Sequence, residues 1–260
     1  MTPPTLLHLV LYAVSAAVLL LTVVSIRLLV VLREHHSDAR PRPSRSAAEP
    51  AHLAVLLGSG GHTAEMMRLV AHLDWTRFSR RTWIISSGDQ LSETKALELE
   101  REIGSGQFRI LWIPRARKVH QSYLTSPLTT LYSLASCLWH ITILPWFCSR
   151  SSQGGGGRGK RRRTFADLIL LNGPGSCVPI AIAAFLPKLV FLPAPSQVYV
   201  ESLARTRRLS LSAKLVRPFV DRFFVQWESL RDALIRAESK DQAKRGARLR
   251  AKVEYQGWLV

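Results

Sequence analysis

Residues 53–67 read Leu-Ala-Val-Leu-Leu-Gly-Ser-Gly-Gly-His-Thr-Ala-Glu-Met-Met. The five apolar residues 53–57 are typical of a parallel strand that is buried on both faces. Residues 58–61 end this strand in a turn, and apolar residues then recur at helical spacing over 62–73. A strand, a glycine-rich turn and a helix in this order predict the first unit of an α/β domain.

The same alternation continues along the chain. The sequence predicts further strands at 82–86, 108–113, 167–171, 198–200 and 222–227, and further helices at 91–103, 178–185 and 228–252. Strands that alternate with helices favour a parallel sheet covered by helices on both faces. The predicted fold class is therefore α/β, with one Rossmann-like, doubly wound parallel sheet.

An uncharged stretch of 22 residues, from Thr5 to Ile26, precedes this domain. As a helix it is about 33 Å long, which is enough to cross the hydrocarbon core of a bilayer. A cleaved signal peptide is the alternative, but it needs a positively charged segment in front, and no basic residue precedes Arg27. Basic residues follow the stretch instead, so we expect a luminal N-terminus and a cytosolic remainder.

The chain is thus predicted to have three parts. Residues 1–32 form the luminal N-terminus and the transmembrane anchor, 33–50 form a linker rich in Arg, Pro, Ser and Ala, and 51–260 form a cytosolic domain. Within the domain, 149–164 is a low-complexity insert with four consecutive glycines and a basic run. A solvated loop, a patch for anionic lipid and a nucleic-acid or nuclear-import patch are the alternatives for this insert.

A second uncharged stretch covers residues 127–148. It is either a second membrane span or a helix packed on the sheet. The recurring Ser and Thr residues, His140 and Pro145 favour the packed helix, with one face turned toward the bilayer.

The composition narrows the class of partner. A net charge of +18 favours an anionic partner, such as nucleic acid, acidic lipid or a phosphate-bearing substrate. No recognised nucleic-acid module or stacking-aromatic motif is present, so nucleic acid ranks last. The three cysteines, Cys137, Cys148 and Cys177, fit neither a metal site nor a secreted disulfide framework. We therefore expect a reducing cytosolic setting and neither metal nor cofactor.

The turn after the first strand is the first candidate site. Consecutive glycines let the backbone approach a ligand, and the following helix directs its N-terminal N–H groups at the same space, which suits a phosphate or diphosphate. Thr63 stands where a dinucleotide fingerprint needs Gly or Ala, and no P-loop lysine follows. A structural turn without a ligand is the alternative. The candidate residues are Gly58, Ser59, Gly60, Gly61 and Thr63.

A second glycine turn follows the strand at 167–171. It reads Asn172-Gly173-Pro174-Gly175. Because ligands of open α/β sheets bind outside the carboxyl ends of the strands, the two turns together favour one shared site. Glu201 also follows a strand and is predicted at the same edge.

Three further side chains are candidates by their chemistry. His62 begins the first helix, and its ordinary pKa suits a general base for a sugar hydroxyl; a capping or loop-shaping histidine is the alternative. Arg115 and Arg117 follow the third strand and could clamp a diphosphate, or they belong to a solvated basic loop.

Six motifs in order carry a resemblance to a known family. The chain resembles the family of subunit fourteen of the asparagine-linked glycosylation pathway over about residues 53–260. Three positions differ from the family pattern. Ser176 and Ala213 are mild changes from Thr and Gly, and Glu228 stands where the family has Pro. The motifs are residues 58–67, 121–123, 172–179, 199–202, 209–215 and 221–227.

The resemblance implies a function. It implies the acceptor half of a split glycosyltransferase of the two-domain GT-B type, anchored in the endoplasmic reticulum membrane, with the nuclear envelope as an additional candidate location. The enzyme would add the second N-acetylglucosamine to GlcNAc-diphosphodolichol. The UDP-GlcNAc site would lie on a separate catalytic partner, subunit thirteen, and this chain would be inactive alone. Residues 58–62 and 172–175 would face the acceptor.

The C-terminal end supplies a candidate partner interface. Tyr255, Trp258, Leu259 and Val260 are poorly suited to a free solvated tail, and aromatic residues are enriched at interface cores. Packing of these residues on their own domain is the alternative. At the level of function, the alternative to an enzyme subunit is a non-catalytic membrane scaffold for a soluble enzyme.

Overall fold

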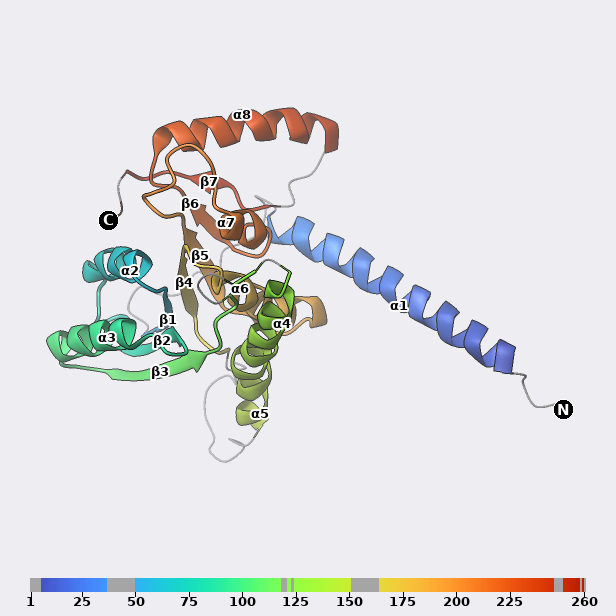
Figure 1. The fold of residues 1–260 in the computed structure, drawn as a ribbon, viewed down its shortest axis with the longest axis horizontal. Helices are drawn as coiled ribbons and strands as arrows, with labels where there is room; N and C mark the ends of the chain where they lie inside the picture. The colour runs from blue at the N-terminus through green and yellow to red at the C-terminus, as the bar shows by residue number, and fades with distance from the viewer. Residues whose placement is uncertain are drawn as a thin grey trace.

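The computed structural model describes residues 6–36, 50–117, 121–122, 124–150, 164–245, 250–257 and 259. A long N-terminal helix projects from an α/β domain (Figure 1). In the described residues the domain has one seven-stranded sheet, in the order β3-β2-β1-β4-β5-β6-β7, and every pair of neighbours is parallel. The strands are β1 (His52–Leu57), β2 (Arg80–Ser86), β3 (Gln107–Ile113), β4 (Leu168–Asn172), β5 (Ser196–Val200), β6 (Arg222–Phe224) and β7 (Val253–Glu254).

Helices cover both faces of the sheet. The core is divided into two clusters, one on each face of the sheet. On one face, Leu53, Val55 and Leu57 of β1 pack with α2 (Gly61–Ala71) and α3 (Gln90–Ile103). Ala54 and Leu56 belong to the cluster on the other face. That cluster includes side chains of α4 (Ser126–Cys137), α6 (Cys177–Phe185), α7 (Leu211–Val216) and α8 (Glu228–Arg245). The predicted doubly wound parallel sheet is confirmed.

Three short elements were not predicted, namely β7, α7 and the 3-10 helix Leu186–Val190. The two residues of β7 pair with Phe223 and Phe224 of β6, and an ion pair between Arg222 and Glu254 joins the same strands. A two-residue strand leaves no periodic pattern, which is why the sequence predicted none. The six residues of α7 are likewise shorter than the window that periodicity needs. Their N-terminus is capped by the hydroxyl of Ser210, which accepts from Ala213 N–H at 3.0 Å.

The predicted helix at 127–148 is present as one continuous helical segment. It consists of α4, a π-helical turn (Leu138–Ile143) and α5 (Leu144–Arg150). Cys137 and Ile141 are buried in the core, and Thr142 Oγ1 donates to the carbonyl of Ala183 at 2.7 Å, so this helix packs on the domain. Large apolar side chains on its other face are exposed, namely Leu128, Leu131, Tyr132, Trp139, Trp146 and Phe147.

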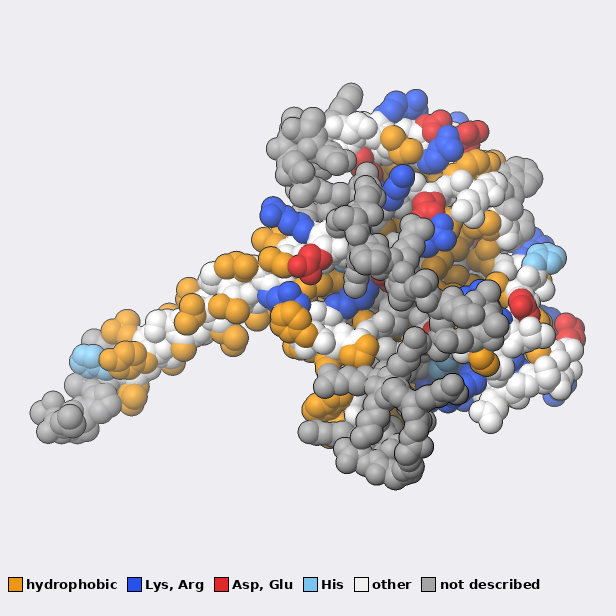
Figure 2. Space-filling view, turned by 180° about the vertical axis from the view of Figure 1, so that it is seen from behind, with side chains coloured by type: hydrophobic (Ala, Val, Ile, Leu, Met, Phe, Trp, Pro, Cys, Tyr) orange, Lys and Arg blue, Asp and Glu red, His pale blue; other side chains and the backbone are white. Residues whose placement is uncertain are grey.

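The N-terminal helix α1 (Leu6–His35) has the length and composition needed to cross a membrane. The helix Ser126–Phe147 also meets this test of length and composition, but it is partly buried in the domain. Apolar side chains surround α1 along its projecting part (Figure 2). The helix extends three residues into the predicted linker 33–50, because its last two turns pack on the domain and are not a free connection.

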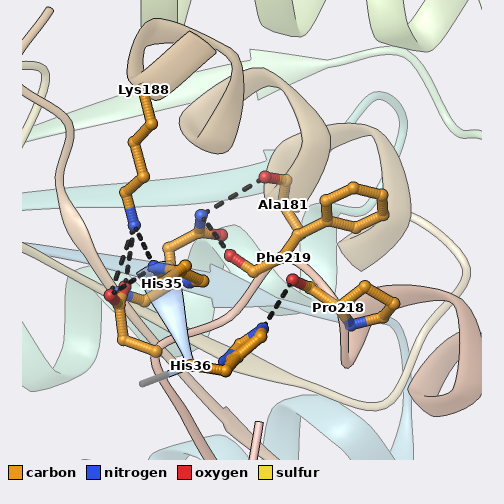
Figure 3. A network of polar contacts seen from close by, with 8 residues as sticks. His35, His36, Ala181, Lys188, Pro218 and Phe219 are labelled. Atoms are coloured by element: carbon orange, nitrogen blue, oxygen red, sulfur yellow. Dashed lines mark hydrogen bonds and ion pairs between the residues drawn. The ribbon is translucent and has the colours of Figure 1, made fainter. Parts of the chain in front are cut away.

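The end of α1 contacts the domain through Arg27, Val31, Leu32, His35 and His36, and we call this contact the anchor joint. Figure 3 shows its polar part, in which His35 lies beside Lys188 and His36 lies beside Pro218. Val31 and Leu32 are buried against Phe185. Arg27 donates to the carbonyls of Leu189 and Lys188 at 3.1 and 3.3 Å and stacks on the ring of Phe191.

Two histidines complete the anchor joint. His35 Nδ1 lies 3.2 Å from Lys188 Nζ and 3.4 Å from Asp221 Oδ1, and Lys188 donates to the same carboxylate. His36 Nε2 lies 2.9 Å from the carbonyl of Pro218, and burial lowers the pKa of His36. Polar contacts therefore surround an apolar centre and hold α1 to the domain.

Candidate functional site

The site lies where the chain reverses its direction across the sheet. From β1 the chain moves through α2 to β2, and from β4 it moves through α6 to β5, on the opposite side. β1 and β4 are neighbours, so the turns that follow them share the crevice at this topological switch point. In open α/β sheets this is the position at which ligands bind. The structure therefore brings together the two predicted glycine turns.

The two turns pack directly on each other. A β-carbon on Gly58 would lie 2.6 Å from Pro174 Cγ and 2.8 Å from His62 Cβ. Gly173 has a φ of 66°, and a β-carbon there would overlap the imidazole of His62. These two glycines are thus required for close packing. Gly60, Gly61 and Gly175 are exposed, as is Ser59, so this part of the turns is open to a ligand.

His62 lies between the two turns. Its Nδ1 is 3.1 Å from Oδ1 of Asn172, and its side chain is 35% exposed. Asn172 is the last residue of β4 and is fully buried. Since Nδ1 is engaged by Asn172, Nε2 is the ring nitrogen that remains for a substrate proton. His62 also lies in the first turn of α2, where the helix dipole and the first N–H groups favour an anion.

Glu65 belongs to the same cluster and was missed by the sequence reasoning. Its Oε2 accepts from Asn172 Nδ2 at 3.1 Å, and its Oε1 accepts from Ser202 Oγ at 2.8 Å. The signal was present, because a residue three positions after His62 on a helix lies on the same face. Ser202 follows β5, so the cluster joins the carboxyl ends of three neighbouring strands.

Thr63 is placed behind the first turn. It is buried, and its Oγ1 lies 2.6 Å from Ser92 Oγ. Ser92 Oγ in turn lies 3.1 Å from the carbonyl oxygen of Gly58 and 2.8 Å from the Asp89 carboxylate, either of which can accept its proton. Thr63 therefore ties the glycine turn to the start of α3, a role in shaping the turn.

Glu201 lies at the predicted edge but is buried. Its carboxylate accepts from the N–H and the hydroxyl of Ser210 at 3.0 and 3.1 Å and from the N–H of Ser202 at 3.1 Å. Burial raises the pKa of Glu201. In this structure Glu201 holds the start of α7 and the Ser202 backbone, and through Ser202 it supports Glu65.

The predicted arginines follow β3, and β2 lies between β3 and β1. Arg115 is half-buried, and the exposed Arg117 donates to the carbonyl of Gln121 at 2.7 Å. A second group of exposed arginines follows β5, next to Ser202, and consists of Arg205, Arg207 and Arg208. This group was not predicted, although the sequence contains it as a short basic run. Cations thus lie on both sides of the glycine turns.

The C-terminal candidates divide into two groups. Tyr255 packs against the core, and Arg231 lies 5.5 Å over its ring. Packing on its own domain was the stated alternative for this residue. Leu259 is partly buried, and Trp258 and Val260 lie outside the described residues.

The buried cysteines are not candidates for nucleophiles. Burial raises the pKa of Cys137 to about 12, and burial, together with the nearby Glu201, raises the pKa of Cys177 well above its ordinary value. Both thiols therefore stay protonated at neutral pH, which makes them unreactive. Among the described residues, no cluster of His, Cys, Asp and Glu that could hold a metal is found.

The fold and the site define a class. A parallel sheet with helices on both faces, whose glycine turns meet at the switch point, defines a Rossmann-like α/β protein. The family model described as "Oligosaccharide biosynthesis protein Alg14 like" matches residues 53–241. The chain belongs to this family, and the resemblance found in the motifs is confirmed.

Curated relatives agree with the family model. The chain is 42% identical over 217 residues to the UDP-N-acetylglucosamine transferase subunit ALG14 of Candida albicans. The aligned region covers 83% of this chain and 89% of the relative. The chain is 38% identical to the subunit of the same name of Schizosaccharomyces pombe, over 82% and 91% of the two chains. The subunit of Rattus norvegicus is 37% identical, over 80% and 86%.

Proposed function

We propose that this chain is the membrane-anchoring, acceptor-binding subunit of a heteromeric UDP-GlcNAc transferase. The enzyme adds the second N-acetylglucosamine to GlcNAc-diphosphodolichol in the synthesis of the N-glycan precursor. The observation that carries the proposal is the His62–Asn172 pair held between two interlocked glycine turns at the switch point. The names of the curated relatives support the same type of enzyme.

The proposed chemistry assigns a role to each part of the edge. The exposed N–H groups of the turn at 58–61 and the start of α2 bind the acceptor diphosphate, since both favour negative charge. The turn at 172–175 lines the same crevice, and the arginine loops after β3 and β5 add cations. His62 Nε2 accepts the proton of the acceptor hydroxyl while the oxygen bonds to the anomeric carbon of the donor, whose bond to UDP breaks.

The donor site is assigned to a second chain. The described residues form one α/β domain around one sheet, and the curated relatives are named as subunits of a transferase. Residues at the C-terminal end, beyond β7, form the proposed interface with the catalytic partner. In this proposal Trp258, Leu259 and Val260 contact the partner, and Tyr255 supports them from the domain side.

The membrane side of the proposal rests on two helices. α1 spans the endoplasmic reticulum membrane, with the domain on the cytosolic side. The exposed apolar face of the helix 126–147, including Leu128 and Trp139, lies against the membrane surface. Leu124, two residues before this helix, is 90% exposed. This arrangement keeps the acceptor-binding edge close to a lipid-borne substrate.

A non-catalytic scaffold is the second candidate. The observation in its favour is that Gly58 and Gly173 are explained by packing alone. A scaffold would recruit the soluble enzyme without binding the acceptor.

One set of measurements separates the two candidates. The purified chain, the purified partner and the assembled complex are assayed with UDP-GlcNAc and a short-chain GlcNAc-diphosphate lipid, and lipid binding by the chain alone is measured by calorimetry. The proposal expects transfer only by the complex and lipid binding by this chain. Transfer by this chain alone would overturn the division of labour. Transfer by the complex without any lipid binding by this chain would favour the scaffold.

A further inference from the structure

We propose that Glu65 is a positioning residue that acts through Asn172 to hold the proton of His62 on Nδ1, so that Nε2 is the basic nitrogen. The proposal rests on the proposed role of His62, and it adds the group that selects the tautomer of that histidine. The two tautomers of a neutral imidazole differ in which nitrogen can accept a proton. Only the Nδ1–H form leaves Nε2 able to act as the base.

The geometry groups three side chains, and Glu65 Oε2 also lies 4.0 Å from His62 Nδ1, where its charge favours a proton on the same nitrogen. Glu65 Oε2 accepts from Asn172 Nδ2 at 3.1 Å, and Asn172 Oδ1 lies 3.1 Å from His62 Nδ1. Asn172 is fully buried, and the side chain of Glu65 is only 17% exposed. Water therefore competes weakly for these groups, and the hydrogen-bond partner of each polar atom is a neighbouring protein group.

The orientation of the Asn172 amide follows from the carboxylate. An ionised carboxylate can only accept hydrogen bonds, so the NH₂ end of the amide has to face Glu65. The carbonyl end then faces His62, and a carbonyl oxygen can only accept. The hydrogen between them must come from His62, which places it on Nδ1. A flipped amide would set its oxygen against the carboxylate, acceptor against acceptor.

The carboxylate itself is held from the other side. Ser202 Oγ donates to Oε1 of Glu65 at 2.8 Å, and the N–H of Ser202 donates to Glu201 at 3.1 Å. Glu65 thereby connects α2, the end of β4 and the turn after β5. A merely structural role would end at this connection, so the test has to measure the imidazole itself.

The first test is the tautomer of His62 by ¹⁵N NMR of the full chain in detergent, with ring-labelled histidine, at a pH at which the imidazole is neutral. The His62 signals are assigned by their loss in His62→Gln. The expected wild-type spectrum shows the Nδ1–H form. An Nε2–H form in the wild-type protein overturns the proposal directly, without any variant.

Three variants then locate the cause. Glu65→Leu removes the acceptor, and the Nε2–H form is expected to appear. Glu65→Gln retains one oxygen for Asn172, because the Ser202 hydroxyl can turn to accept, and it is expected to keep the Nδ1–H form. Ser202→Ala removes the second contact of Glu65 but not the first, and it is also expected to keep that form. An unchanged tautomer in Glu65→Leu would reduce Glu65 to a packing role and overturn the proposal.

Activity of the complex separates this proposal from the proposed function. Glu65→Leu is expected to lower kcat by between about 10- and 10,000-fold, the range seen when a group that orients a functional histidine is removed. Glu65→Gln should recover most of that loss. If the tautomers behave as expected while His62→Ala turns over normally, the base role of His62 fails and the positioning by Glu65 stands.

Discussion

The imidazole of His62 occupies the space that a β-carbon on Gly173 would take. The two residues lie more than 100 positions apart in the chain, His62 in the first turn of α2 and Gly173 in the turn after β4, yet they share one small space. Gly173 has a left-handed φ of 66°, and its missing side chain is what allows His62 to reach Asn172. The catalytic proposal therefore depends on a glycine as much as on the histidine.

Gly173→Ala should separate His62 from Asn172. The left-handed backbone alone costs a residue other than glycine roughly 1–3 kcal/mol, and displacement of the ring should lower turnover on the order of 100-fold. The matched control is Gly175→Ala in the same turn, where a β-carbon meets nothing within 4 Å and φ is not positive. Steady-state kinetics and denaturant unfolding compare the two; equal losses in both variants would contradict the prediction.

His62→Ala should lower turnover far more than it lowers binding of the catalytic partner. Loss of a general base typically costs ~100- to 10,000-fold in rate. The assembled complex is quantified by co-purification, and kcat is then measured per complex. Near-normal turnover in the assembled complex would leave His62 with a role in shaping the loop only.

Two truncations should behave differently because of the anchor joint. Removal of residues 1–26 keeps Val31 and Leu32 on Phe185, so the domain should stay folded and shift largely to the soluble fraction. Removal of residues 1–36 uncovers that apolar surface and should lower the free energy of unfolding by roughly 3 kcal/mol or more. If the protein that lacks residues 1–26 instead stayed in the membrane fraction after a high-salt wash, the helix 126–147 would itself be a membrane anchor.

Stability should fall as the pH drops from about 6.5 toward 4. Burial and the nearby Arg109 and Arg80 lower the pKa of His52 to about 4, and its Nε2 lies 2.8 Å from Thr82 Oγ1. Between these pH values the unfolded chain binds the proton and the folded chain does not, so the stabilisation is present above about 6.5 and lost through about 4.

The matched variant for this pH effect is His52→Gln, which can still bond to Thr82. The free energy of unfolding of both proteins is measured by denaturant at a series of pH values. Between pH 6.5 and 4 it should fall less in the variant than in the wild type, by a difference of at most about 3 kcal/mol. Parallel profiles would show that His52 does not carry the pH dependence.

Deletion of residues 258–260 should abolish co-purification with the partner and leave the domain folded. Tyr255→Ala is the contrasting variant, because Tyr255 packs on the core and contacts Arg231, so its loss should lower stability first. Full co-purification and full activity after the deletion would rule out the tail as the interface.

The sequence predicted the large elements well because their patterns are long. β1 contains a run of apolar residues that ends at Gly58, and the turns at 58–61 and 172–175 mark the ends of adjacent strands. Glu65 and the two-residue β7 were missed for a different reason. Their roles depend on partners more than 25 residues away, Asn172, Ser202 and β6, and only the folded sheet brings these together.

The burial of Glu201 and Thr63 likewise could not be predicted. Both follow elements that were correctly identified, and both are polar, so an exposed position facing a ligand was the simpler expectation. Glu201 is hydrogen-bonded to Ser210, and Thr63 is hydrogen-bonded to Ser92, so both side chains are engaged inside the domain. A polar residue beside a candidate site is read correctly only when its own partners are known.

The anchor joint changes what the membrane can do to this domain. A flexible tether would let the sheet tumble above the bilayer, whereas a helix that continues into the core behaves as a lever with the sheet fixed to its end. When a spanning helix adapts to hydrocarbon thickness it does so largely by tilting. With α1 in the membrane as proposed, that tilt is passed through Val31, Leu32 and His36 to the sheet. Bilayer thickness then sets the angle at which the glycine turns meet an incoming lipid headgroup.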